Sequence, residues 1–487
     1  MPIIPVGEWI PDASALGNPG SIVIRNAVPG PNSYQPFRAH TPVTVALDSR
    51  PLGGISVRDK ANNVFNYVGS QEALYVQLGA SWTDVSRYGG YTTLDGEAWE
   101  FVQWKNRVLA TNFNDLPQFI DLGGTEFDDL TSDLRGRHIA VVRDHVVFGN
   151  TWDPVDGEVP DRVRWSAFND ETDYTVDPAT GSDFRDLKAG GWIQRIVGGE
   201  FGVIVSERST FRMTWVGAPV WFQIDEVLPG VGAISPGTVV NLSGTVFFWS
   251  EQGIIALTNG TGVAFPGAGK VDRFIKNDLD EAYRHRITGV ADARSNRVMW
   301  AYPGSGNTGG RPNRIIVYDV SLNRWSLIET EVELLWRAST PGRNLDEITE
   351  TLEELGDISL DSPIFVGGTP NLAAFNADYE HGFFAGQIMT AVIDTKETEI
   401  HAGRMTQLNA FRPVVDGGTV RARVATRNRQ TDPPVFGDFL TQTASGRFTT
   451  RANARYHRFR LEISGDWRDA IGVQIEPNEA RRAGFRG

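Results

Sequence analysis

The sequence predicts an all-β protein built as a β-propeller of about six or seven blades. The chain has 487 residues, of which 52 are glycines and 26 are prolines, scattered without the period of collagen. This composition is typical of many short strands joined by tight turns. Apolar residues make up 40% of the chain, which is enough to build a folded core.

A repeat with the length of one blade supports the propeller. "VFNYVGSQEALYVQLGASWTDV" (64–85) matches "VLATNFNDLPQFIDLGGTEFDDL" (108–130) at an offset of 44 residues. A four-stranded propeller blade takes roughly 40 to 50 residues. Looser copies follow along the chain, and we align them on the aliphatic residues Val64, Val108, Val146, Val203, Val246, Val298 and Ile364.

The first 60 residues are predicted to form an arm that runs over the outside of the molecule. Seven prolines lie within the first 36 of these residues, and proline lacks the backbone donor that a central strand needs. These are Pro2, Pro5, Pro11, Pro19, Pro29, Pro31 and Pro36.

The propeller is predicted over residues 61–393, and "RVRWSAFND" (162–170) is typical of its strands. Val163 and Trp165 alternate with two arginines, so one face is apolar, and Ser166 follows at the strand end. Asn169 and Asp170 are turn formers that hydrogen-bond to nearby backbone. We therefore interpret Trp165 as a filler between sheets, with a sugar-stacking role as the alternative.

Further residues are expected to be structural signatures of the blades. Glycines allow close approach of backbones, and tryptophans fill the space between sheets. The residues expected in these structural roles are Gly198, Gly199, Gly202, Trp215, Trp249 and Trp300.

Two helical excursions are predicted between blades. Residues 271–287 carry Val271, Phe274, Ile275, Leu279 and Tyr283 on one face of a helix. The acidic segment 344–356 has Asn344 as a candidate N-cap and ends at Gly356.

Residues 394–487 are predicted to form a separate small β domain. We expect turns at Asp416-Gly417-Gly418 and at Ser464-Gly465-Asp466, because glycine beside aspartate favours turns. From Gly446 to Gly487 there are nine arginines and five acidic residues. This arginine-rich tail is interpreted either as a surface for an acidic partner or as a solvated strand face.

No catalytic, cofactor or metal site is predicted. The chain has no cysteine and only seven histidines, without a zinc-binding pair. "TTLDGEAW" (92–99) fails the spacing of a sialidase box, and "PGAGKV" (266–271) lacks both the first glycine and the final hydroxyl of a phosphate-binding loop. We expect a protein that is not an enzyme and that binds no cofactor.

No membrane segment or signal peptide is expected either. The start, "MPIIPVGEWIPD", lacks a basic region followed by a long apolar run, and no apolar run approaches roughly 18 residues. The sequence is therefore expected to belong to a soluble protein.

The formal net charge of −14 argues against sequence-specific recognition of nucleic acid, which requires clustered lysine and arginine. It is compatible with DNA that passes close by, because an acidic channel wall repels phosphate and lets DNA slide.

Four segments resemble the tail hub, or tail nozzle, proteins of short-tailed bacteriophages, also described as phage DNA stabilisation proteins. They are "RVRWSAFNDETDY" (162–174), residues 183–219 beginning "DFRDLKAGGW", "FFWSEQGIIAL" (247–257) and residues 269–302 beginning "GKVDRFIKND". The resemblance extends from about Pro2 to Tyr318, and more loosely beyond. The acidic segment around Leu345 to Leu355 departs from the pattern of the family.

The resemblance implies a structural virion protein located in the phage tail and assembled in the bacterial cytoplasm. Such a subunit is expected to form a homo-oligomer, a hexamer, below the portal and adaptor rings at the head-to-tail connection. The ring would extend the DNA channel, retain the genome until DNA ejection, and anchor tail fibres or spikes and a plug or needle. Double-stranded DNA would pass through it without sequence-specific binding.

Two alternative functions are kept open. One is a carbohydrate-binding or carbohydrate-cleaving propeller of a receptor-binding tail component, which needs exposed aromatic residues and carboxylates at one mouth. The other is a cellular scaffold of the kelch or WD-repeat kind, although repeated Gly-His and Trp-Asp signatures are absent from the sequence.

Overall fold

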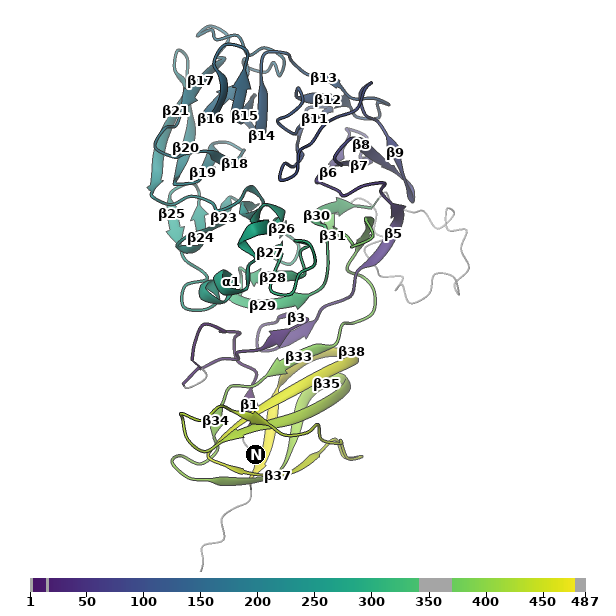
Figure 1. The fold of residues 1–487 in the computed structure, drawn as a ribbon, viewed down its shortest axis with the longest axis vertical. Coiled ribbons are helices and arrows are strands. Elements are labelled where there is room, and N and C mark those ends of the chain that lie inside the picture. The colour runs from purple at the N-terminus through teal and green to yellow at the C-terminus, as the bar shows by residue number, and fades with distance from the viewer. Residues whose placement is uncertain (1–2, 15–16, 341–369, 478–487) are drawn as a thin grey trace, which may run out of the picture.

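The chain folds into a seven-bladed β-propeller and a smaller β domain beside it (Figure 1). The computed structural model describes residues 3–14, 17–340 and 370–477. Six four-stranded sheets stand alone, and a seventh set of four strands continues into the sheet of the smaller domain. The predicted all-β propeller is confirmed, with seven blades.

The blades follow one another in chain order. Blade 1 contains β6 (Gly53–Arg58), β7 (Val64–Gly69), β8 (Leu74–Leu78) and β9 (Ser81–Asp84); blade 2 contains β10 (Glu100–Trp104), β11 (Arg107–Thr111), β12 (Gln118–Asp121) and β13 (Asp128–Asp129). Blade 3 contains β14 (Arg135–Val142), β15 (His145–Asp153), β16 (Gly157–Trp165) and β17 (Asp183–Asp186); blade 4 contains β18 (Ile193–Val197), β19 (Gly202–Ser206), β20 (Ser209–Gly217) and β21 (Trp221–Pro229).

The remaining three blades complete the ring. Blade 5 contains β22 (Val240–Leu242), β23 (Thr245–Ser250), β24 (Gly253–Thr258) and β25 (Gly262–Ala264); blade 6 contains β26 (Thr288–Asp292), β27 (Arg297–Tyr302), β28 (Arg314–Asp319) and β29 (Arg324–Glu329). Blade 7 contains β30 (Leu334–Ser339), β31 (Pro370–Phe375), β32 (Glu380–Phe383) and β5 (Thr41–Ala46).

The residues used to align the repeats lie at equivalent places in the blades. Val64, Val108, Val146, Val203, Val246 and Val298 each begin, or nearly begin, the second strand of a blade. Ile364 lies outside the described residues.

These second strands are apolar on both faces because each blade packs between two others. On β23, Val246 and Phe248 belong to the core shared with blade 4, whereas Phe247 and Trp249 belong to the core shared with blade 6. A strand buried on both faces reads as a continuous apolar run, which explains "TVFFWS". Burial of both faces holds each thin sheet in the ring.

The predicted arm over residues 1–60 is wrong at its end, because two blade strands lie within it. β5 completes blade 7 by pairing with β32, and β6 is the first strand of blade 1. Thr41–Ala46 therefore joins the N-terminal segment to a blade whose other strands come from residues 334–383. Pro42 is tolerated because β5 is the outermost strand of its sheet, where one side of the backbone needs no partner.

The N-terminal segment before β5 connects the propeller to the second domain. β2 (Ile24–Arg25) pairs with β29 of blade 6 and with β33 (Ala391–Asp394), while β1 (Ile3–Pro5) and β4 (Tyr34–Pro36) pair with β38 (Tyr456–Pro477). β3 (Ala27–Pro29) pairs with β4. The hydroxyl of buried Tyr34 accepts from the Trp9 amide at 3.0 Å and donates to the Trp325 carbonyl of blade 6 at 3.1 Å.

The helical prediction over residues 271–287 corresponds to two short helices, α1 (Asp272–Asp278) and the 3₁₀ helix η2 (Glu281–Arg286). The chain leaves helical geometry at Leu279, and the Asp280 carboxylate then accepts from the Ala282 amide at 3.2 Å to start η2. A further 3₁₀ helix, η1 (Pro236–Thr238), precedes blade 5. The helix predicted over residues 344–356 lies outside the described residues.

The second domain is built on two strands of 22 residues each, β35 (Thr406–Arg427) and β38. The turns predicted at Asp416-Gly417-Gly418 and Ser464-Gly465-Asp466 are wrong, because both triplets lie inside these strands. Gly417, Gly418 and Gly465 have positive φ, and the register between the strands shifts around Gly417. The glycines therefore form bulges that bend a continuous strand pair.

Shorter strands complete this domain. The predicted boundary of 394–487 is wrong, because strands from before residue 394 belong to the same sheet. β33, β34 (Thr398–Glu399), β36 (Val435–Phe436) and β37 (Phe448–Ala454) pair with the two long strands, together with β1 and β4 from the N-terminal segment. The sheet needs these N-terminal strands because β38 would otherwise expose part of its edge.

Several arginines of the C-terminal region pair inside the domain. Arg460 donates two hydrogen bonds, of 2.6 and 2.9 Å, to the fully buried carboxylate of Asp394. Arg455 donates to Glu399 at 2.5 Å, and Arg447 lies 2.7 Å from Glu476. These side chains therefore stabilise the domain instead of forming only a solvated face. Across the described part of the chain, no helix is long and apolar enough to cross a membrane.

Candidate functional site

The candidate site is the central channel of the propeller. A cavity of about 780 Å³ is lined by the first strands of all seven blades, which are β6, β10, β14, β18, β22, β26 and β30. Neighbouring first strands run in the same direction, as the parallel bridge between Val142 and Gly199 illustrates. Residues at the same level of different blades therefore face a common axis.

Charged residues gather near the N-terminal ends of these strands, and we call this end the charged mouth. It comprises Arg50, Glu97, Glu100, Arg137, Arg195, His285, Arg286 and Glu333. Much of the remaining channel wall is apolar and includes the half-buried Ile55, Phe101, Val102, Val141 and Val197. One further cation, the half-buried Arg337 of β30, also lines it.

Two arginines of the charged mouth, Arg137 and Arg286, are bound closely to carboxylates. Arg137 donates two hydrogen bonds to Glu97, at 2.8 and 2.9 Å. The buried Glu333 accepts from Arg286 and, at 2.6 Å, from Arg311. These pairs fix the loops that enter blades 2, 3, 6 and 7.

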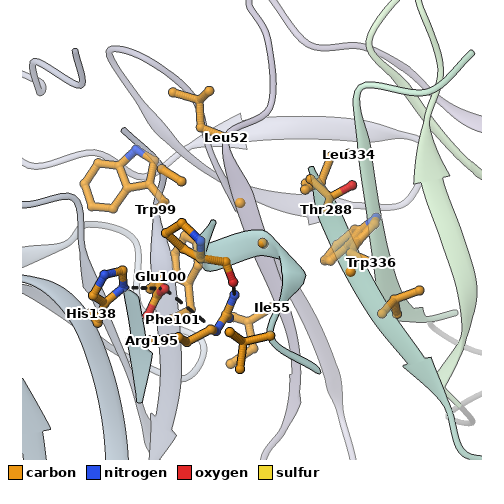
Figure 2. A pocket seen from close by; sticks show the side chains of 18 of the residues that line it. Leu52, Ile55, Trp99, Glu100, Phe101, His138, Arg195, Thr288, Leu334 and Trp336 are labelled. Carbon is orange, nitrogen blue, oxygen red and sulfur yellow. Dashed lines mark hydrogen bonds and ion pairs between the residues drawn. The ribbon is translucent and has the colours of Figure 1, made fainter. Parts of the chain in front are cut away.

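Glu100 lies at the centre of a buried cluster that connects three blades (Figure 2). Its carboxylate lies 2.8 Å from Nδ1 of His138, accepts from the Ile139 amide at 3.2 Å, and lies 3.8 Å from Arg195. Burial opposes ionisation of Glu100, but Arg195 and then His138 outweigh it and hold the pKa of the carboxyl below its ordinary value.

Arg50 and Arg195 differ from the other mouth arginines. The nearest carboxylate of Arg50 is the exposed Asp95 at 3.8 Å, and Arg50 makes no hydrogen bond to another described residue. Arg195 makes one long hydrogen bond, of 3.5 Å, to the Pro236 carbonyl. Their side chains are only 27% and 37% exposed. Both guanidinium groups thus keep most of their donors unused inside the channel.

Two tryptophans flank the channel in the view of Figure 2. The buried Trp99 donates from Nε1 to the Ser70 carbonyl at 2.7 Å. Trp336 lies against the backbone of Gly54, where a Cβ would approach its ring to 2.9 Å. Glycine at this position lets the ring of blade 7 pack directly on the first strand of blade 1.

The residues predicted from "RVRWSAFND" pack against the turn that begins β15. Trp165 is fully buried, donates to the Gly181 carbonyl at 2.8 Å, and packs edge-on against Phe222 of blade 4. Ser166 accepts from the Val146 amide at 3.1 Å. A buried Trp165 has no free face on which a sugar could stack.

Asn169 and Asp170 form the turn that follows. Asn169 has a φ of 59°, and its amide donates to the Asp144 carbonyl at 2.8 Å. Asp170 accepts from the Thr172 amide at 3.0 Å, and this bond is the main cause that lowers the pKa of its carboxyl. The end of β16 is therefore connected to the start of β15 through Trp165, Ser166, Asn169 and Asp170.

The three glycines lie where blade 4 meets blade 3. A Cβ on Gly198 would lie 2.0 Å from the Val141 carbonyl oxygen, so only glycine fits there. Gly199 donates to the same carbonyl at 3.0 Å and accepts from the Arg143 amide at 2.9 Å. Gly202 begins β19 against Val142 and Met213.

The tryptophans of blades 4 to 6 have two kinds of environment. Trp249 and Trp300 are buried with ring centroids 5.8 Å apart, and Trp300 donates to the Thr238 carbonyl at 2.8 Å. Trp215 is 36% exposed, and the Arg143 guanidinium lies 4.5 Å above its ring. Of the ten predicted residues, only Gly198 lines the channel. The others hold blades together or lie at their surface.

Sequence reasoning missed Glu100, His138 and Arg195, although the repeat contains a signal for them. Each lies eight residues before an aligned valine, namely Val108, Val146 and Val203. The alignment therefore places an acid, a histidine and an arginine at the same level of three consecutive blades.

Comparison with family models and with characterised protein sequences finds no match. Solved structures give weak likenesses. The WD40 domain of Pan2 from Neurospora crassa is 8% identical, with 61% of this chain and 89% of that chain covered at a TM-score of 0.37. BamB from Moraxella catarrhalis is 10% identical, with 73% and 95% covered at a TM-score of 0.35.

BBS1N, solved in complex with ARL6DN, is 11% identical, with 72% and 96% covered at a TM-score of 0.37. Likenesses at this level carry no argument about function. The assignment as a propeller rests on the seven blades themselves.

Proposed function

We propose that this chain is a ring-forming structural subunit of the tail of a short-tailed bacteriophage, located below the portal and adaptor rings. In this role a homo-oligomer, expected to be a hexamer, extends the DNA channel, retains the packaged genome and anchors fibres or spikes and a plug or needle. The role is structural and requires no catalytic residue or cofactor. The support comes from the sequence resemblance and from three features of the fold.

The resembling segments make up consecutive blades. Two of the segments, residues 162–174 and 183–219, belong to blades 3 and 4. Residues 247–257 belong to blade 5. Residues 269–302 include α1, η2 and the first two strands of blade 6. The resemblance therefore extends over four consecutive blades of the propeller and is not limited to one strand pattern that every blade repeats.

The observation that carries the structural role is the way the N-terminal segment connects both domains. β1, β2 and β4 add to the sheet of the second domain, β2 also pairs with blade 6, and β5 completes blade 7. Pulling the domains apart would break several of these strand pairs together. Such a connection suits a subunit that resists the pressure of packaged DNA.

A groove of about 550 Å³ between blades 3 and 4 offers a surface for contact between copies. The valines at its rim, Val216 and Val220, are 48% and 54% exposed. Arg185 and Lys188 border the groove and form no ion pair with another described residue, since the nearby Asp186 pairs with Arg162 at 2.7 Å. Exposed valines beside two free cations suit an acidic, partly apolar surface.

A second copy of this chain can supply such a surface because its net charge is −14. The groove lies on one side of the propeller only. If it binds a different face of the next copy, the two copies contribute different surfaces, and the contact is heterologous. Contacts of this kind form a ring when the rotation between neighbouring copies closes, and closure is what the proposed hexamer requires.

Double-stranded DNA is proposed to pass through the assembled ring without sequence-specific binding. The acidity of the chain supports an acidic lumen, which repels phosphate and keeps DNA mobile. Purified protein should therefore leave DNA duplexes of different sequence equally unretarded in a gel at physiological salt.

The proposal is tested by mixing the purified protein with portal–adaptor complexes. Co-sedimentation of this chain with the complexes, in a fixed ratio and at saturation, is the expected result. Failure to bind, together with binding to a glycan array, would favour the carbohydrate-binding alternative.

A further inference from the structure

The central cavity has the size and lining of a binding site for a small molecule. Its volume of about 780 Å³ lies within the range of roughly 300 to 1,000 Å³ that is typical of ligand pockets. Half-buried apolar side chains form much of its wall, and most of its charged groups are concentrated at one end, with Arg337 of β30 as a further cation. This combination is usual for sites that hold an apolar body and orient a polar group.

The arginines at the charged mouth are satisfied unequally. Arg137 and Arg286 each donate closely to a carboxylate, that of Glu97 and that of Glu333. Arg195 has its nearest carboxylate at 3.8 Å, and that oxygen, Oε1 of Glu100, already contacts His138. Arg195 therefore has donors to spare, and Figure 2 shows it on the side of the pocket where Glu100 and His138 lie.

Arg50 enters the mouth from blade 1, on the far side of the ring from Arg195 in blade 4. Burial, and then the like charge of Arg286, lower the pKa of Arg50 below its ordinary value. Burial also lowers the pKa of His285, and the positive charges of Arg50 and Arg286 contribute. The carboxylates of Glu333 and Asp95 offset part of this repulsion, and a bound anion would offset more of it.

We propose that the central cavity binds a small organic anion, whose carboxylate or phosphate group is held by Arg195 and whose apolar body lies against the half-buried wall that includes Ile55 and Phe101, while Arg50 adds positive charge from the opposite side of the charged mouth. Arginine suits this role because its planar fork offers two parallel hydrogen bonds to either group. The site is a property of each propeller, so it is independent of ring assembly and of the proposed tail function.

The test is titration calorimetry of the full chain with three probes that share a phenyl ring. Phenyl phosphate and phenylacetate carry the two candidate anionic groups, and phenyl β-glucoside is the neutral counterpart. We expect saturable binding of at least one anion at one site per chain, and no saturable binding of the glucoside up to about 10 mM. The tighter of the two anions identifies the preferred group.

Arg195→Gln and Arg50→Gln should each weaken binding of the preferred anion, Arg195→Gln by at least roughly tenfold. Arg195→Lys should fall between the wild type and Arg195→Gln, because it keeps the charge and loses the fork. Arg25→Gln is the matched control, since Arg25 is 46% exposed and pairs with Glu329 outside the channel. Its affinity should equal that of the wild type.

Thermal midpoints separate loss of binding from loss of folding. If Arg195→Gln fails to fold, Arg50→Gln and Arg195→Lys decide the question. The proposal is overturned if neither anion binds saturably, if the glucoside binds as well as the anions, or if the folded arginine variants keep wild-type affinity.

Discussion

Glu100 in the first strand of blade 2 lies 2.8 Å from Nδ1 of His138 in the first strand of blade 3. Because Glu100 also accepts from the Ile139 amide, one buried carboxylate holds two blades together at the channel wall. Removal of the carboxylate would leave both partners without an acceptor in a buried position.

Glu100→Ala should therefore lower the free energy of unfolding by about 3 kcal/mol, and Glu100→Gln by less, because an amide oxygen can still accept one of the two bonds. Urea denaturation followed by tryptophan fluorescence measures this. Glu331→Ala is the control, since Glu331 is 50% exposed and pairs with Arg311 at 3.4 Å, and it should have little effect. Equal losses in both variants would show that the buried cluster does not stabilise the ring.

Gly198→Ala should be strongly destabilising. The added Cβ would lie 2.0 Å from the carbonyl oxygen of Val141, where blades 3 and 4 meet, and a backbone atom cannot move aside as a flexible side chain can. We expect a loss of about 2 kcal/mol or more. Gly262→Ala is the matched control, because its nearest neighbour is 3.5 Å away. A thermal midpoint of Gly198→Ala equal to that of Gly262→Ala would contradict the close approach of the blades.

Much of the propeller could be predicted from the sequence because blade repetition leaves a periodic apolar signal. Six aligned valines mark the second strands, which are largely buried on both faces and therefore carry mostly apolar residues. The proline-rich start misled the prediction at β5, because a short outer strand tolerates Pro42 and lacks the strong apolar signal of an inner strand. Ring closure depends on contacts between residues more than 300 positions apart, which local patterns do not reveal.

The site was harder to predict than the fold. Glu100, His138 and Arg195 come from three blades, and a charged residue in an inner strand looks locally like an ordinary strand face. In the second domain, glycine triplets that usually signal turns form bulges in long strands, because β35 and β38 pair along nearly their whole length.

Acid should destabilise the seam between blades 7 and 1 through His381. This residue is fully buried among the rings of Trp82, Trp336, Phe375 and Phe383, and neither ring nitrogen has a partner among the described residues. Burial lowers the pKa of His381 from 6.5 to about 3.

Between these values the unfolded chain binds a proton that the folded chain does not. The contribution of neutral His381 is therefore fully present above pH 6.5 and is lost as the pH falls toward 3, at about 1.4 kcal/mol per pH unit. Urea denaturation between these pH values should give a flatter profile for His381→Leu than for the wild type. The control is His401→Leu at an exposed site, for which the free energy of unfolding should depend on pH as in the wild type. If His381→Leu also showed the wild-type dependence on pH, His381 would not be the cause of the acid destabilisation.

Charge reversal at the groove between blades 3 and 4 should prevent contact between copies. Arg185→Glu with Lys188→Glu removes both cations that border the exposed valines, and we expect the assembled fraction to fall at least roughly tenfold. Mass photometry measures this fraction. Arg208→Glu with Lys276→Glu changes the net charge equally on other surfaces and should leave assembly intact.

The central claim, that this chain forms a ring in a phage tail, is tested most directly by negative-stain electron microscopy of the purified protein, alone and mixed with its adaptor. Class averages with sixfold symmetry and a central channel, alone or on the adaptor, are the predicted result. Single propellers in both samples, at concentrations where the adaptor itself forms rings, would contradict the claim.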